Sequence, residues 1–264
     1  MVDDILRYDL YHDDEISDAV VQQASELFSE HYGVWSKQAP GKMGGRVRAG
    51  ARVRLSPTLL RTECLPHPSP GVLKTTLFRA VLPNNQPIAH LCATSWHATL
   101  PCACAGSDPP RPFRVCWVTQ LVVHSAYRRR GIASSLLGRL RADVEVQDAD
   151  SGYGKPRLYG ILSSHPASVM AFARVFGQGI EGVDGGRLES GEWIMCESPV
   201  RYVREGWRKV RAGVGSVDTG FWVDHAEVEK VLGEVRRERG WPLGELVEGC
   251  EFLLIMSGDS GAVR

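Results

Sequence analysis

A change of periodicity between residues 115 and 140 limits the folds that this chain can adopt. Residues 115–123 are rich in β-branched and aromatic side chains, which is typical of a buried strand. After a turn at residues 124–126, apolar residues recur at the spacing of one buried helical face: Ile132, Leu136, Leu137 and Leu140. The sequence therefore predicts a strand, a short turn and a helix in direct succession.

The turn between this strand and this helix is basic and contains small residues. Arg128, Arg129 and Arg130 precede Gly131, and Ala133 stands just inside the predicted helix. A helix start leaves backbone N–H groups without intrahelical partners, and its dipole favours an anion. The arginines add charge and donors, while the small residues leave room for a phosphate beside the backbone. The turn suits a diphosphate, although a solvated basic turn before an ordinary helix fits the same residues.

The hexapeptide at residues 128–133, RRRGIA, fits the pattern (Q/R)-x-x-G-x-(G/A) and lies between the predicted strand and helix. In this it resembles the signature of the GNAT N-acetyltransferases. The resemblance implies that the turn binds the pyrophosphate of acetyl-CoA and that the strand edge binds its pantetheine arm. The cofactor-binding residues that it implies are Leu121, Val122, Val123, Arg128, Arg129, Arg130, Gly131, Ile132, Ala133 and Ser134.

Composition excludes several other classes of protein. The 31 basic residues balance 31 acidic ones, so the overall charge favours neither nucleic acid nor a membrane surface as partner. No run approaches the roughly 18 apolar residues of a membrane span, and the acidic N-terminus lacks a signal-peptide core. The seven cysteines are odd in number and scattered, which fits a reducing compartment. We therefore expect a cytoplasmic protein, and no metal site, because Cys102 and Cys104 lack a second pair of ligands.

The N-terminal segments predict a wall for the acceptor substrate. Residues 14–32 have the pattern of an amphipathic helix, and Tyr32 and Trp35 follow it. In GNAT proteins the first helices and their loop contact the acceptor, so the resemblance implies substrate binding by these two aromatics; capping of the core is the other interpretation. Residues 37–54 are predicted to form a basic loop, and Ser56 before Pro57 predicts the start of a short helix.

The central third predicts the order of elements in that family. Strands at residues 72–82 and 87–97 are joined by an Asn-containing turn, and a proline-rich loop at 100–113 leads to the strand at 114–123. After the helix come a strand at 158–162 and a helix at 167–176, closed by Gly177. This layout makes the strands at 114–123 and 158–162 parallel. By resemblance they splay apart and hold the pantetheine between them.

The catalytic groups depart from the family pattern. Many GNAT proteins have a tyrosine in the helix after the second parallel strand, where this chain has Phe172, and a glutamate on the first, where it has Thr119. The candidates left for catalysis are His165, Ser164 and His97, of which the histidines have the pKa range of a base. A structural histidine or a chain of water molecules that ends at a backbone carbonyl fits the same sequence.

The last third extends beyond the small family core. A strand near 221–223, a helix at 226–239 capped by Asp224, and an apolar strand at 250–256 are expected to close the sheet. We therefore predict a mixed α/β GNAT fold with enlarged N- and C-terminal regions. The single domain spans residues 1–264, with its core at 72–177 and less regular extensions at 1–71 and 178–264.

The function that these expectations favour is acetyl-CoA-dependent N-acetylation of a primary amine by direct attack on the thioester. The enlarged terminal regions favour a small-molecule acceptor over a protein tail, while the oligomeric state stays open. Because the usual carboxylate and tyrosine are absent, a second hypothesis is an acetyl-CoA-binding sensor or scaffold without efficient catalysis.

Overall fold

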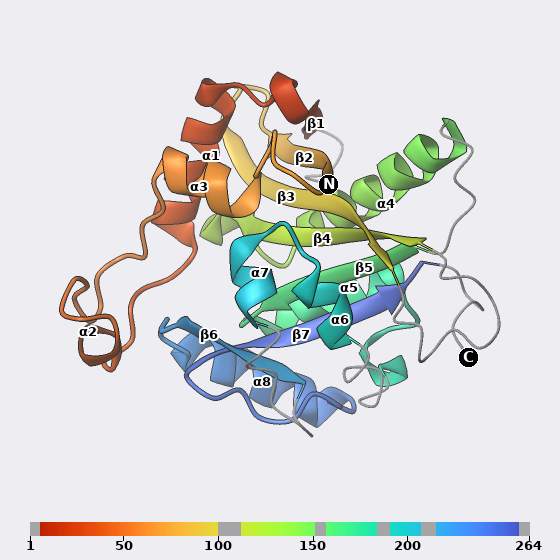
Figure 1. Ribbon diagram of the computed structural model, residues 1–264. Coiled ribbons are helices and arrows are strands. Elements are labelled where there is room, and N and C mark those ends of the chain that lie inside the picture. Colours follow the sequence, from red (N-terminus) through yellow and green to blue (C-terminus); the bar gives the residue numbers. More distant parts are fainter. Residues whose placement is uncertain (1–5, 100–111, 151–156, 184–190, 207–214, 259–264) are drawn as a thin grey trace.

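The computed structural model describes residues 6–99, 112–150, 157–183, 191–206 and 215–258. Its centre is a seven-stranded mixed sheet in the order β1-β2-β3-β4-β5-β7-β6 (Figure 1). The predicted mixed α/β architecture is therefore confirmed. The strands are β1 Arg7–His12, β2 Val72–Val81, β3 Pro87–Thr99, β4 Pro112–Val123, β5 Arg157–Ser163, β6 Ser216–Phe221 and β7 Gly249–Ser257.

Pairing in the sheet follows the predicted order of the central segments. The β2–β3 hairpin turns through Asn85, whose φ of 65° is the left-handed conformation that asparagine tolerates. β4 is antiparallel to β3 and parallel to β5. The crossover between β4 and β5 is made by α4 Ile132–Asp150, in agreement with the predicted strand–helix–strand unit.

Two layers of helices cover the sheet. α4, α5 Pro166–Phe176 and α8 Ala226–Glu238 lie on one face, where they share a core with the strands. α1 Asp18–His31, α3 Pro57–Cys64, α6 Gly191–Cys196 and α7 Arg201–Gly206 lie on the other. α6 and α7 stand in front of the sheet in Figure 1, and the four-residue α2 Ala39–Lys42 projects from its side. We call these the α4 face and the α1 face.

Short 3₁₀ helices lie at Asp13–Glu15, Ser125–Tyr127 and Ile180–Gly182. The predicted cap of α3 is confirmed, because the Ser56 hydroxyl accepts the Leu59 N–H. The four predicted apolar positions of α4 are all buried. None of the described helices is long and apolar enough to cross a membrane.

Four local predictions were wrong. β1 was missed, and a short helix, α2, lies inside the predicted basic loop. β6 ends at Phe221 instead of beginning there, so that Val223 makes only an isolated bridge to Trp35. The residue before α8 is His225, although the Asp224 carboxylate still accepts the Ala226 N–H at 3.0 Å. Gly177 follows α5 as predicted, but with an extended backbone.

Candidate active site

A β-bulge marks the point where β4 leaves β5. Cys92 of β3 pairs with Gln120, but the next residue, Ala93, pairs with Val118, so Thr119 is an extra residue on β4. The parallel pairing of β4 with β5 also runs only from residue 114 to Val118. Residues 119–123 therefore extend past the paired region, and a gap opens between the strands beside the bulge.

The bulge also decides which side chains face each layer of helices. Trp117 packs with α6 and α7, and Val118 packs with α4 and α5. In a regular strand Val122 would share the face of Val118. The extra residue reverses this, so Val122 lies on the α1 face with Leu27 of α1. Residues 121 and 123 contact the α4 face.

The basic turn is open to a ligand on its backbone side. Arg129 has a φ of 63° and Gly131 a φ of 81°, and such left-handed residues turn successive N–H groups toward a common anion site. A Cβ atom built on Gly131 would meet no described atom within 4 Å. α4 begins at the next residue, Ile132, whose side chain is buried, while Ala133 and Ser134 form the first helical turn. The turn therefore has left-handed residues and space beside Gly131, and phosphate binding there stays a prediction.

The three arginines of the turn differ in their surroundings. The Arg128 guanidinium donates to the His31 carbonyl at the end of α1 and to the Glu227 carboxylate, the latter at 2.8 Å. It thereby ties the turn to α1 and α8. Arg129 and Arg130 are exposed, and Arg130 lies over the Tyr127 ring at 5.1 Å. The exposed pair suits phosphate contacts, whereas Arg128 also has a structural role.

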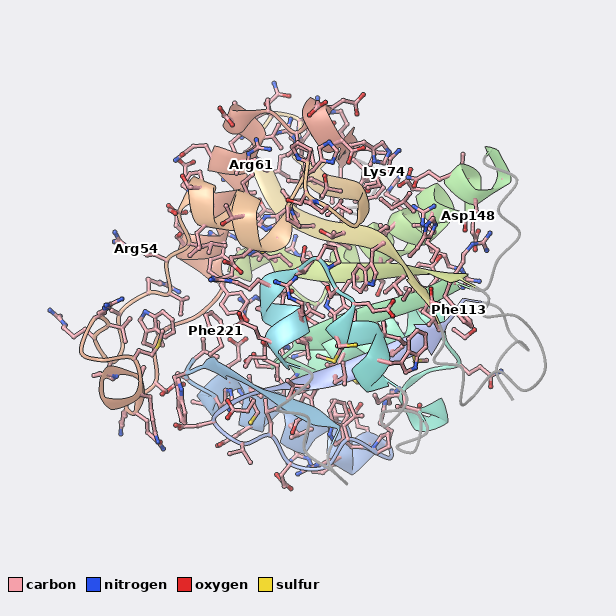
Figure 2. All side chains as sticks on the ribbon, viewed as in Figure 1. Arg54, Arg61, Lys74, Phe113, Asp148 and Phe221 are labelled. Carbon is pink, nitrogen blue, oxygen red and sulfur yellow. The ribbon has the colours of Figure 1, made fainter. Side chains whose placement is uncertain are left out.

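Aromatic side chains surround Val122 on the α1 face. Tyr32 and Trp35 both pack against the cluster that contains Val122. Phe221, at the end of β6, lies 5.7 Å from the Tyr32 ring and 5.5 Å from the Trp35 ring between centroids (Figure 2). The two residues expected to bind the acceptor thus lie beside the residue expected to bind the thioester arm. Phe221 joins them because β6 ends there, which its sequence alone did not indicate.

A polar residue that the sequence analysis did not identify, Glu251, also lies on the α1 face. Glu251 of β7 is only 9% exposed, and burial raises its pKa to about 7, partly offset by a hydrogen bond with Thr219. Burial also raises the pKa of Tyr32, and the nearby Glu251 adds to this effect. The Tyr202 hydroxyl donates to the Thr119 carbonyl at 3.0 Å. One carboxyl and two phenols therefore gather beside the bulge.

The signal for Glu251 was present in the sequence but weak. Residues 249–257, GCEFLLIMS, carry a single carboxylate in an otherwise apolar run. A buried strand with one acid is unusual, because an isolated charge is costly to bury. Tyr202 lies in α7, inside residues 193–207, whose sequence mixes strand-like and helical patterns. Only the fold shows that residues 202 and 251 approach Tyr32.

The three residues expected to act in catalysis lie in different places. Ser164 is buried just after β5 and lies near enough to Tyr32 to lower the pKa of that phenol. His165 caps α5, because its Nδ1 accepts the Ala167 N–H at 3.2 Å. His97 pairs with residue 114, at the end of the sheet that Phe113 occupies in Figure 2, opposite Phe221. The structure brings Ser164 to the bulge region and leaves His97 at the far end of β4.

Glu227 of α8 connects the turn to the start of α5. Its carboxylate bonds to Arg128 and lies 3.8 Å from Nε2 of His165. The nearby His165 is the largest cause that lowers the pKa of Glu227, to about 2, and Arg128 adds to it. This contact brings three elements together on the α4 side of the gap.

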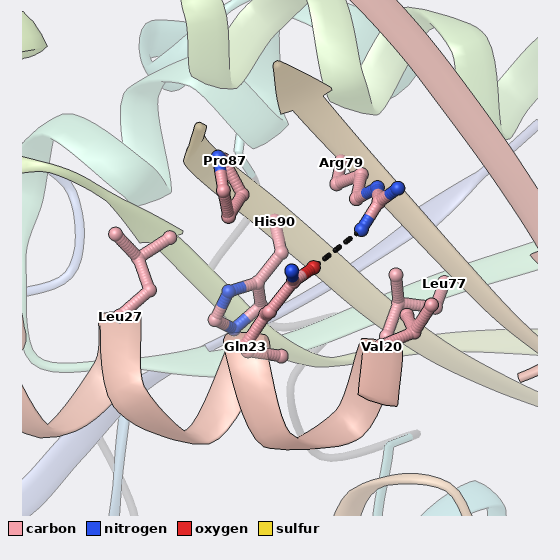
Figure 3. Close-up of a pocket in the computed structure, with 8 residues that line it drawn as sticks. Val20, Gln23, Leu27, Leu77, Arg79, Pro87 and His90 are labelled. Atoms are coloured by element: carbon pink, nitrogen blue, oxygen red, sulfur yellow. Dashed lines mark hydrogen bonds between the residues drawn. The ribbon is translucent and has the colours of Figure 1, made fainter. Parts of the chain in front are cut away.

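The small cavity in Figure 3 is lined by other residues than those of the group beside the bulge. It encloses about 10 Å³ under α1 and is lined by His90 of β3 and by Arg79, whose guanidinium donates to Gln23 at 2.6 Å. Nε2 of His90 lies 2.6 Å from the Gln120 amide oxygen, and burial lowers its pKa to about 4. A space of this size holds about one water molecule, so it cannot admit a cofactor.

Among the described residues, no group of three or more His, Cys, Asp or Glu side chains is arranged to hold a metal ion. Cys102 and Cys104 lie outside the described residues. The donor set at the bulge is one carboxyl with phenols and a serine hydroxyl. It suits proton transfer.

Comparison with known proteins gives a family for the central part of the chain. Residues 65–149 match the model of the acetyltransferase (GNAT) family. No curated protein compared with the chain matches it.

Several solved structures are similar to the fold at low identity. The ribosomal-protein-S18-alanine N-acetyltransferase from Escherichia coli is 9% identical, with a TM-score of 0.37 over 64% of this chain and 76% of that one. An aminoglycoside acetyltransferase from an uncultured soil metagenomic sample, in complex with sisomicin, is 13% identical, with a TM-score of 0.37 over 70% and 95%. The segment that matches the acetyltransferase (GNAT) family model, residues 65–149, includes the bulged strand and the basic turn.

Proposed function

We propose that this protein transfers an acetyl group from acetyl-CoA to a primary amine of a small molecule by direct attack on the thioester. The observation that carries the proposal is the end of the β4–β5 pairing at the bulge, close in sequence to a turn in which Arg129 and Gly131 have left-handed backbones. The family match over residues 65–149 includes the bulge of β4 and the basic turn.

On this proposal the diphosphate of acetyl-CoA lies against Gly131, Ile132, Ala133 and Ser134, with Arg129 and Arg130 beside it. N–H groups at the start of a helix and arginine side chains are suited to this charge. The pantetheine arm follows residues 121–123 into the gap. A backbone N–H of β4 near Val122 polarises the thioester carbonyl as negative charge develops on its oxygen.

The amine approaches from the opposite face, along Tyr32 and Trp35. Both aromatic rings contact the cluster around Val122, which supports their role as the acceptor wall. Ser164 is the best placed of the three catalytic candidates, because it is buried beside Tyr32. His165 is bound as a helix cap, and His97 lies at the far end of the sheet.

The same arrangement supports a single domain over residues 1–264. Tyr32 comes from the N-terminal extension and Phe221 from the C-terminal one, and their rings pack together. β6 and β7 extend the sheet of the core. Each extension therefore contributes to the wall of the proposed acceptor site.

Calorimetry with acetyl-CoA tests the cofactor site. We expect the wild type to bind and Gly131→Ala to bind about tenfold or more weakly, since one charge-assisted hydrogen bond contributes about 1.5–3 kcal/mol. Gly138→Ala is the matched control, because Gly138 lies within α4, away from the turn, and its Cβ atom would meet nothing within 4 Å. Absence of wild-type binding would overturn the proposal.

Release of free thiol from acetyl-CoA in the presence of a panel of primary amines tests the transfer. Acetylation of an amine with stoichiometric thiol release supports the enzyme. Tight binding of acetyl-CoA with no thiol release on any amine supports the sensor or scaffold instead.

A further inference from the structure

Glu251 lies on the α1 face of the sheet, the face that carries the proposed acceptor wall. β7 lies between β5 and β6, and Glu251 pairs with Val217 of β6. Phe252 packs on the α4 face and Leu253 packs with α6 and α7 on the α1 face. Since side chains alternate along a strand, Glu251 shares the face of Leu253. The bulge places Val122 on this same face.

Two phenols lie between Glu251 and the bulged strand. Tyr32 comes from the end of α1, and Tyr202 comes from α7 and donates to the Thr119 carbonyl. The Glu251 carboxyl lies close enough to both to raise their pKa values, after the larger effect of their burial. The carboxyl therefore lies within the group that surrounds the open end of the strand gap.

Glu251 has no compensating charge. None of the ion pairs found in the described parts of the chain includes it, and its hydrogen-bonding partner Thr219 is neutral. The titratable groups near it are Tyr32 and Tyr202, and both of these lie near Cys64 at the end of α3, whose pKa burial raises to about 12. All three are neutral near pH 7. A buried carboxyl without a cation costs folding free energy, and such groups are concentrated at functional sites.

We propose that Glu251 is the general base that removes a proton from the acceptor amine. This inference rests on the proposed acetyl transfer and adds the residue that starts it. An alkylammonium ion has a pKa of about 10.4 and cannot attack a thioester until it loses a proton. A base whose own pKa lies near the working pH is the most effective acceptor of that proton.

The step balances without any further reactant. The Glu251 carboxylate takes one proton from the ammonium ion, directly or through one water molecule. The nitrogen lone pair forms the C–N bond to the thioester carbonyl carbon, and the C–S bond breaks. The departing thiolate takes the second proton of the nitrogen, which leaves an amide and a free thiol. Glu251 then returns its proton to solvent.

The geometry favours Glu251 over His165 for this role. Nδ1 of His165 already accepts a backbone N–H, and Nε2 faces the Glu227 carboxylate. That contact lies on the α4 side with Arg128, next to the proposed diphosphate site. Glu251 lies on the α1 side, next to the proposed acceptor wall.

The test compares the wild type with Glu251→Gln in the full chain. We expect kcat to fall by about 10²–10⁴-fold, the usual contribution of a positioned base, while the Kd for acetyl-CoA is unchanged. The kcat/KM of the wild type should rise with pH through about 7, and this rise should be absent in the variant. Glu229→Gln, an exposed carboxylate on α8, is the matched control and should behave as wild type.

The possible results distinguish a failure of the Glu251 assignment from a failure of the proposed function. Activity of Glu251→Gln within about threefold of wild type, with the same pH profile, overturns the base. A wild-type kcat/KM without a rise near pH 7 also overturns it, whether or not the variant folds. If the wild type does not bind acetyl-CoA, or acetylates no amine, the proposed function fails first and the base assignment falls with it.

Discussion

Replacement of Glu251 by glutamine should stabilise the protein at alkaline pH. The pKa of this carboxyl rises from its ordinary value of 4.5 to about 7 in the folded state. Since one pKa unit corresponds to about 1.36 kcal/mol, ionising the buried carboxyl costs the folded state at most about 3 kcal/mol. Glutamine has nearly the same shape and stays neutral, so it avoids this cost.

The sign of the effect follows from where each state binds the proton. Between about pH 4.5 and 7 the folded protein keeps the proton on Glu251, whereas the unfolded chain has lost it. The contribution of this group to stability is therefore complete below pH 4.5, and it is lost as the pH rises to 7 and above. The difference between variant and wild type should grow over the same window.

Urea unfolding of both proteins at pH 5 and pH 8 measures this difference. We expect the variant to exceed the wild type by less than about 1 kcal/mol at pH 5 and by about 2–3 kcal/mol at pH 8. Glu229→Gln, made in parallel, corrects for the removal of one negative charge. A variant less stable than wild type by the same amount at both values would refute the reasoning. It would mean that the carboxylate is a stabilising structural group.

Two further pairs of substitutions test the strands and the turn. Gly160→Ala should lower stability by about 1–3 kcal/mol in urea, because its Cβ atom would lie 2.2 Å from the Trp117 ring. Gly138→Ala should be neutral or stabilise by up to about 1 kcal/mol. Arg128→Ala should lower the Tm by about 2 °C or more, since its guanidinium bonds to α1 and α8. Arg130→Ala, at an exposed position, should leave the Tm unchanged in calorimetry.

The central elements were predictable because their signals are local. The β2–β3 hairpin, β4, α4, β5 and α5 each carry their own periodicity and turn residues, and all are confirmed. β1 carried no such signal. Its sequence, RYDLYH, has no β-branched residue, and it becomes a strand by pairing with the edge of β2. Tertiary contacts, and not local propensity, therefore determine that these residues form a strand.

The candidate site was predictable only in part, for a geometric reason. The basic turn is a continuous motif, so one hexapeptide was enough to identify it. The group of Tyr32, Tyr202 and Glu251 is drawn from α1, α7 and β7, which are far apart in the sequence. No spacing rule connects these residues. The histidines drew attention because their pKa range suits a base, yet burial gives Glu251 the same range.

On our proposal, the single extra residue at Thr119 allows one strand to contact two substrates. Without the bulge, Val122 would share the α4 face with Val118, and both would lie on the side of the basic turn. With it, residues 121 and 123 face α4 while Val122 faces α1. On our proposal the donor therefore approaches along residues that the family match covers, whereas the acceptor is held by the flanking regions. Those regions supply Glu251 as well, so the choice of amine and its activation depend on the parts of the chain outside residues 65–149.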